Sequence, residues 1–143
     1  MGILIKPLSI LGLVAVFSAA PLAISEPQKI MVVTNASDLG LINKQQLKQI
    51  YMKGISYNLK PINLNKGNKT RAIFNSTIIG LTESRINSYW VQMEFSGKAE
   101  APLEFDNIKS ILNQLNQESR SIAYLPQGTE IPNDLHIIYT LEY

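Results

Sequence analysis

The chain has 143 residues, of which 45% are hydrophobic, and a formal net charge of +2, with one histidine and no cysteine. This composition excludes a disulfide-stabilised scaffold and a lipid attached to cysteine, and it leaves a zinc centre without a plausible ligand set. Packing alone must therefore hold the folded part together.

Residues 1–25 have the pattern of a secretory signal peptide. Lys6 gives a positive start, residues 8–22 are almost wholly apolar, and residues 23–25 place small side chains before residues 26–27. An uncleaved membrane anchor fits less well, because the apolar run is nearer to about 15 than to about 20 residues. We therefore expect a periplasmic or secreted protein with no stable membrane span after cleavage.

Removal of 25 of the 143 residues leaves 118. That length suffices for one domain with a proper core, so residues 26–143 are predicted to form a single domain. The first predicted strand is 29–34 (KIMVVT), which has the β-branched richness of a buried strand. Asn43 is placed to cap a helix with an apolar face over residues 47–51, and Gly54 is placed to end it.

Residues 61–64 form the next predicted strand, and the polar turn 65–69 (NKGNK) connects it to a helix over about 70–79. The free amides and the dipole of such a helix favour an anion in front of it, and three basic residues lie around this turn. Such a turn can hold phosphate or sulfate, or it can stay empty. The predicted anion-binding residues are Asn68, Lys69, Thr70 and Arg71.

Gly80 is placed to end this helix, and Thr82 is placed to cap the next one. A bulky apolar stripe on that next helix is expected to pack against a sheet, so its Trp90 is interpreted as a core residue. The stripe consists of Ile86, Tyr89, Trp90 and Met93.

Residues 98–105 are expected to form a loop. Asp106 is then placed to cap a helix whose apolar residues between positions 108 and 115 recur at i, i+3, i+4 and i+7. Two strands follow, at 121–125 (SIAYL) and at about 135–141. Strands that alternate with short helices predict an α/β domain with a mixed sheet flanked by helices, in which ligands bind beyond the carboxyl ends of strands.

The charges are distributed unevenly along the chain. Residues 39–82 carry seven basic residues and no acidic one, whereas residues 83–143 carry nine acidic and four basic residues, giving net charges of +7 and −5. Either the two halves attract each other across the folded surface, or the first half presents a positive face to an anionic ligand or partner. Nucleic acid is not an expected partner, because few aromatic residues lie between the basic ones.

Residues that carry catalysis are sparse. His136 lies in the last predicted strand and is interpreted as a partly exposed strand residue, while Glu100, Glu104 and Asp106 are interpreted as a solvated acidic patch. No phosphate-binding P-loop, dinucleotide-binding glycine pattern or Gly-x-Ser-x-Gly turn occurs. The sequence therefore predicts no metal site and no cofactor, and it argues against an enzyme.

Several motifs recur in an order that is typical of one family. They are residues 47–54 (LKQIYMKG), Thr70 with Phe74, residues 89–90 (YW), residues 95–98 (FSGK) and residues 121–125 (SIAYL). Together they resemble the substrate-binding proteins of bacterial phosphate ABC transporters, most closely the short single-lobe members. The resemblance covers roughly residues 29–125.

This resemblance implies a single periplasmic-binding-protein-like lobe with an anion site at the helix start near Thr70. The family has Ser-Gly-Thr in its phosphate loop, and this chain has Asn68-Lys69-Thr70, so that only the threonine is kept. Receptors of this family close two lobes around the ligand. High affinity in a single lobe would therefore need a second subunit or an envelope protein as the missing wall.

Two functions stay open at this point. The chain is either an exported non-enzymatic protein that binds phosphate or another oxyanion weakly, or an envelope protein-interaction module with a basic face and no small-molecule ligand.

Overall fold

The computed structural model describes residues 2–53 and 58–143, so that the predicted helix stop at Gly54 lies outside the described residues. The helices are α-helical except η2, which is a π-helix. In chain order the elements are β1 (Lys29–Thr34), α1 (Lys44–Lys53), β2 (Lys60–Leu64), α2 (Lys69–Phe74), η2 (Asn75–Ile79), α3 (Glu83–Phe95), β3 (Leu103–Phe105), α4 (Ile108–Gln117), β4 (Ser121–Pro126) and β5 (His136–Glu142).

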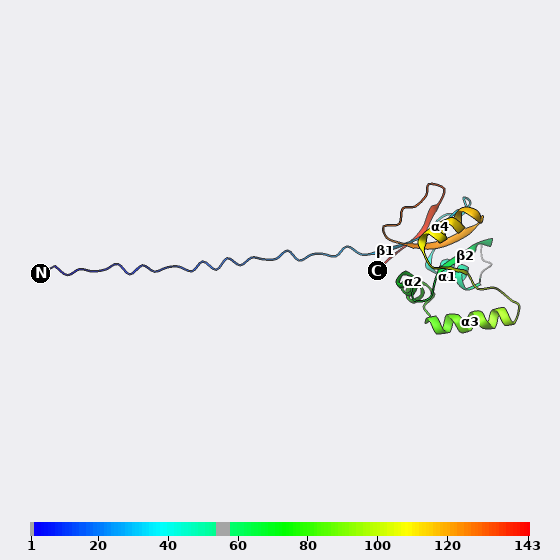
Figure 1. The fold of residues 1–143 in the computed structure, drawn as a ribbon, viewed down its shortest axis with the longest axis horizontal. Coiled ribbons are helices and arrows are strands. Elements are labelled where there is room, and N and C mark those ends of the chain that lie inside the picture. The colour runs from blue at the N-terminus through cyan, green and yellow to red at the C-terminus, as the bar shows by residue number, and fades with distance from the viewer. Residues whose placement is uncertain (1, 54–57) are drawn as a thin grey trace.

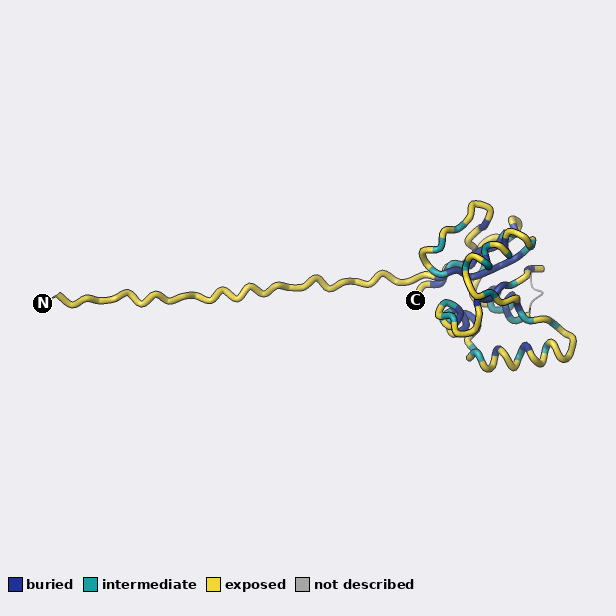
Figure 2. The backbone as a smooth tube through the Cα atoms, viewed as in Figure 1, coloured by how far each residue is buried: buried dark blue, intermediate teal, exposed yellow. Residues whose placement is uncertain are grey.

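Residues 2–27 run away from the domain as an extended, exposed segment without helix or strand (Figures 1 and 2). The predicted cleavage after residue 25 concerns processing of the chain and stays a prediction. Among the described residues, no helix combines the length and the apolar character needed to cross a membrane.

The strands form one mixed five-stranded sheet, in the order β3-β2-β4-β1-β5. β2 runs parallel to both β3 and β4, whereas β1 runs antiparallel to both β4 and β5. The predicted α/β architecture with a mixed sheet flanked by helices is thus confirmed. Because β2, β3 and β4 are parallel, their carboxyl ends meet at one edge of the sheet, where the loop before α2 also lies.

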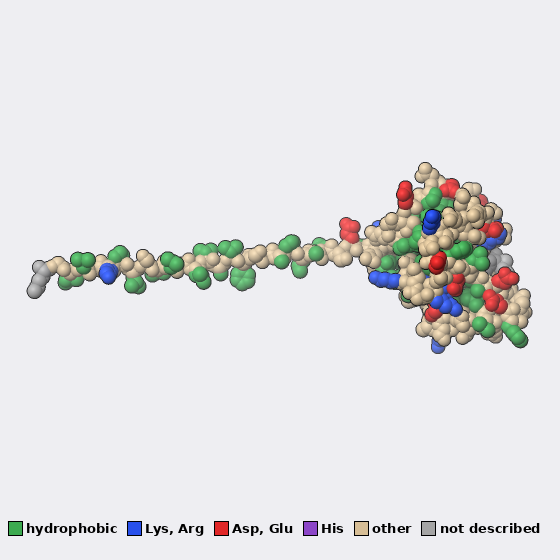
Figure 3. Space-filling view, viewed as in Figure 1, with side chains coloured by type: hydrophobic (Ala, Val, Ile, Leu, Met, Phe, Trp, Pro, Cys, Tyr) green, Lys and Arg blue, Asp and Glu red, His purple; other side chains and the backbone are tan. Residues whose placement is uncertain are grey.

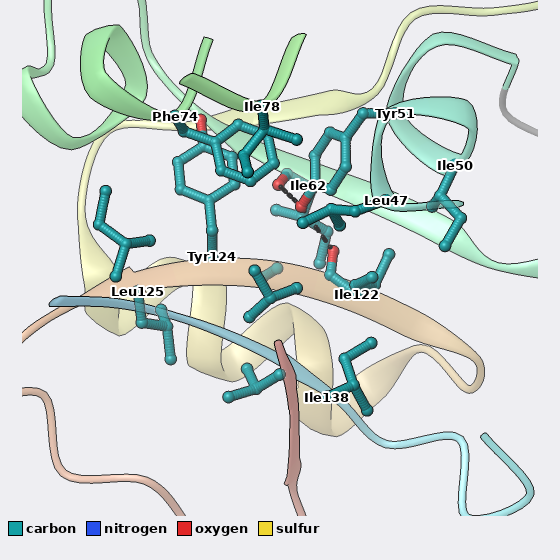
Figure 4. Close-up of a cluster of buried hydrophobic side chains, with 14 of the residues drawn as sticks. Leu47, Ile50, Tyr51, Ile62, Phe74, Ile78, Ile122, Tyr124, Leu125 and Ile138 are labelled. Atoms are coloured by element: carbon teal, nitrogen blue, oxygen red, sulfur yellow. Dashed lines mark hydrogen bonds between the residues drawn. The ribbon is translucent and has the colours of Figure 1, made fainter. Parts of the chain in front are cut away.

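The central strand β4 is covered on both faces. Tyr124 contacts Phe74 and Tyr51 on one face, with ring centroids 4.1 Å and 5.7 Å away (Figure 4). Its neighbours in the strand point to the other face, since side chains alternate along a strand. α4 packs against β4, β2 and β3, and Figure 1 shows it across the sheet from α1 and α2. The core therefore lies in two layers, one on each side of the sheet.

Three predictions need correction. Residues 98–105 are not all loop, because residues 103–105 form the edge strand β3, which pairs with β2. α4 is capped by Asn107 rather than by Asp106, since the Asn107 side chain accepts from the amide of Ser110 at 2.8 Å. The predicted helix over 70–79 begins as α-helix but continues as the π-helix η2, and Gly80 ends it in the left-handed conformation, with φ 72°.

α3 packs on the domain through part of its predicted stripe. Ile86 and Trp90 are buried, so the interpretation of Trp90 as a core residue is confirmed. Tyr89 is half-buried, and its hydroxyl donates to the carbonyl of Met52 at 2.5 Å. At the far end of the helix, Phe95 is 96% exposed, and Figure 1 shows α3 running along the border of the domain.

Candidate functional site

The loop before α2 contains the residue that caps this helix. Gly67 takes a φ of 86°, which turns the chain after β2, and Asn68 then adopts extended backbone. The Asn68 side-chain oxygen accepts from the amide of Thr70 at 2.8 Å and from the amide of Arg71 at 3.3 Å. The first helix amides are thus hydrogen-bonded by the protein itself, as expected of an asparagine N-cap.

Arg71 is the buried charge of this site. Only 3% of its side chain is exposed, although it follows an exposed lysine in the first turn of α2. Its Nε and Nη2 donate to the two carboxylate oxygens of Glu83 at 3.1 Å and 2.5 Å. Its Nη1 donates to Glu104 at 2.8 Å and to the carbonyl of Leu64 at 2.7 Å. One guanidinium therefore joins α2 to α3, β3 and β2.

The two carboxylates stabilise the charged form of this guanidinium. Burial alone lowers the pKa of Arg71, but the hydrogen bonds that Arg71 donates to Glu83 and Glu104 outweigh it and raise that pKa above its ordinary value. Both carboxylates keep contact with water, since the side chains of Glu83 and Glu104 are 38% and 37% exposed. The interpretation of Glu104 as a purely solvated acid is therefore corrected.

Asn75 adds a third donor to Glu83. It is the first residue of η2 and is 7% exposed, and its Nδ2 donates to Oε2 of Glu83 at 2.9 Å. We name the group formed by Arg71, Asn75, Glu83 and Glu104 the Arg71 cluster. Sequence reasoning missed Asn75 and Glu83. Asn75 follows Arg71 by four residues, so helical spacing could have indicated it, whereas Glu83 follows by 12 residues and belongs to the next helix.

A hollow of about 320 Å³ lies beside the Arg71 cluster. Its lining includes Asn68, Arg71, Asn75 and Glu83, so two of the four predicted anion-binding residues face it. Lys69 is exposed and Thr70 is half-buried, and neither lines this hollow. The structure thus brings part of the predicted set together and adds side chains from η2 and from the start of α3.

Some basic residues between positions 39 and 82 form ion pairs with acidic residues between positions 83 and 143. Lys60 pairs with Glu118, and Arg71 pairs with Glu83 and Glu104. Acidic and basic side chains accordingly interleave on the viewed face in Figure 3. The lysines of α1 make no ion pair with a described residue; they are Lys44, Lys48 and Lys53.

Residues typical of metal or histidine chemistry do not gather in the described part of the chain. Within residues 2–53 and 58–143, no three His, Cys, Asp or Glu side chains lie where they could hold a metal ion. His136 is an exposed residue at the start of β5. The Arg71 cluster holds buried hydrogen-bond donors, and its own two carboxylates accept from them.

Solved structures share this architecture. An ABC-type phosphate transport receptor from Vibrio cholerae matches with a TM-score of 0.58 and 15% identity, over 78% of this chain and 46% of the receptor. This chain thus shares the fold of part of that receptor. A Clostridium perfringens protein described as a phosphate ABC transporter substrate-binding protein, with phosphate bound, matches with a TM-score of 0.60 and 14% identity. The match covers 78% of this chain and 44% of that protein. PstS from Borrelia burgdorferi matches with a TM-score of 0.53 and 11% identity, over 71% of this chain and 42% of PstS.

These likenesses concern the fold, and the resemblance seen in the sequence is confirmed at that level. No protein-family model matches the sequence, and no curated protein matches it. The chain spans less than half the length of each of these receptors. It therefore corresponds to a part of the receptor fold, as a single lobe does.

Proposed function

We propose that this chain is an exported, non-enzymatic binding protein that takes phosphate or another small oxyanion weakly at Asn68, Lys69, Thr70 and Arg71. Its place of action would be the periplasm or the medium, after removal of residues 1–25. The observation that carries the proposal is an open hollow beside a buried guanidinium, at the ligand-binding edge of a fold shared with phosphate-transport receptors.

Weak affinity follows from the same geometry. The amides of Thr70 and Arg71 already bond Asn68, and the guanidinium already bonds two carboxylates, so an incoming oxyanion must replace existing partners. The hollow also faces water, which competes for each hydrogen bond. A second subunit or an envelope protein that covered the hollow would raise the affinity.

Calorimetric titration with phosphate at low salt tests the proposal. We expect binding in the millimolar range and a rise in melting temperature with phosphate, but not with the same concentration of chloride. Lys69→Ala should weaken binding by several fold, because it removes a positive charge at the loop. Lys109→Ala on α4 is the matched control and should leave binding unchanged. No heat together with an unchanged melting temperature at about 10 mM phosphate would refute the proposal.

A second candidate is an envelope interaction module with a basic face, and the lysines of α1, which make no ion pair with a described residue, favour it. Such a face would meet an acidic partner or an anionic surface polymer. Replacing Lys44 and Lys48 by Glu should abolish capture of that partner from an envelope extract while phosphate titration of the variant stays as in the wild type. Equal capture by the wild type and this variant would exclude the basic face.

A further inference from the structure

Three hydrogen-bond donors converge on one carboxylate in the Arg71 cluster. Nε and Nη2 of Arg71 reach the two oxygens of Glu83, and Nδ2 of Asn75 reaches one of them. Both donor residues are more than nine-tenths buried, whereas the Glu83 side chain is 38% exposed. The donors are therefore the fixed part of this arrangement, and the carboxylate is the part that can turn outward.

The donors do not depend on the ligand being a carboxylate. A guanidinium fork presents two parallel N–H groups, and it accepts carboxylate or phosphate oxygens in the same two-bond geometry. The hollow of about 320 Å³ is lined by Arg71, Asn75 and Glu83 together, so the space beside the carboxylate is open to a small anion. If Glu83 turned outward, Arg71 would keep its bonds to Glu104 and to the carbonyl of Leu64.

We infer that Arg71 and Asn75 form the oxyanion seat of this chain, and that Glu83 fills this seat at rest as an internal competitor. The identity of the ligand rests on the proposed function. The seat adds Asn75 as a donor and Glu83 as a competitor to the residues proposed there. Binding is then an exchange, in which the oxyanion takes the donors and Glu83 moves into water. Because Glu83 lies in the first turn of α3, this exchange also releases one tie between α2 and α3.

Glu83→Ala tests the inference by emptying the seat. We expect phosphate to bind this variant about tenfold more tightly than the wild type, since the anion no longer displaces a charge-assisted pair. Glu100→Ala is the matched control, because it removes the same charge from an exposed residue that makes no ion pair with a described residue. Adding Asn75→Ala to Glu83→Ala should remove most of the gain.

The outcomes separate the seat from the proposed function. If Glu83→Ala binds phosphate more tightly than the wild type and Glu100→Ala does not, the result supports the seat. If the wild type also binds no phosphate, the proposal of weak binding by the natural chain fails. Wild-type binding that Glu83→Ala leaves unchanged, or that Glu100→Ala raises equally, overturns the seat and keeps the proposed function. Absence of binding in both overturns both. Should Glu83→Ala not fold, Glu83→Gln removes the charge at constant size, and it must also bind more tightly than the wild type.

Discussion

Replacing Arg71 by methionine should destabilise the domain by about 2 to 3 kcal/mol. The side chain is 3% exposed and makes four hydrogen bonds, two to Glu83, one to Glu104 and one to the carbonyl of Leu64. Removing one partner of a buried ion pair costs roughly 3 to 5 kcal/mol. This value is reduced here, because both carboxylates are more than a third exposed and regain water, and because methionine refills part of the apolar space.

Urea unfolding at pH 7 measures this loss, and Lys69→Met is its control. That variant removes the same charge from an exposed position two residues earlier, and it should change the free energy of unfolding by less than about 0.5 kcal/mol. The cost of Arg71→Met should persist in 1 M salt, which screens exposed pairs far more than buried ones. A loss below about 0.5 kcal/mol would show that the desolvation of Arg71 offsets its bonds and that the Arg71 cluster does not hold α3 and β3 to the sheet.

Three further predictions concern the N-cap of α2 and the aromatic residues of the core. Asn68→Ala should destabilise the domain by about 1 kcal/mol, the usual cost of losing an N-cap, as measured by urea unfolding. Phe74→Ala should cost about 3 to 5 kcal/mol by the same measurement, because the ring is fully buried and stacked on Tyr124. Burial raises the pKa of both Tyr51 and Tyr124, so the unfolded chain loses these protons first and stability falls as pH rises above about 10. The fall should reach about 1.4 kcal/mol per pH unit for each tyrosine, and replacing both by Phe should flatten it between about pH 10 and 11.

Sequence patterns predicted those elements whose signal is local. Residues 29–34 form β1 within the predicted bounds, because a run of β-branched residues fits a strand buried on both sides. The predicted helix over residues 108–115 is α4, whose Ile111 and Leu115 are buried as the spacing requires. Gly80 ends its helix because its φ of 72° suits glycine.

The missed features depend on contacts between distant segments. β3 has three residues and exists because β2 pairs with it, a partner that no window around residue 103 contains. The burial of Arg71 has the same origin, since Glu83 and Glu104 follow it by 12 and 33 residues. A basic residue beside exposed lysines gives no local sign that two carboxylates will enclose it. The predicted anion site stays a prediction, and the side chains around Arg71 could not be predicted locally because tertiary packing brings them together.

Arg71 takes its anionic partners from within this chain. A guanidinium that is 3% exposed needs anionic partners, because leaving a buried charge unpaired is far more costly than leaving a surface charge unpaired. The partners of such a guanidinium can come from a ligand, from a second lobe or from this chain. Its own Glu83 and Glu104 fill the role, from the start of α3 and from β3. Covering the hollow with a partner should therefore shift the balance from Glu83 toward an oxyanion, since excluding water strengthens every hydrogen bond that the exchanged anion makes.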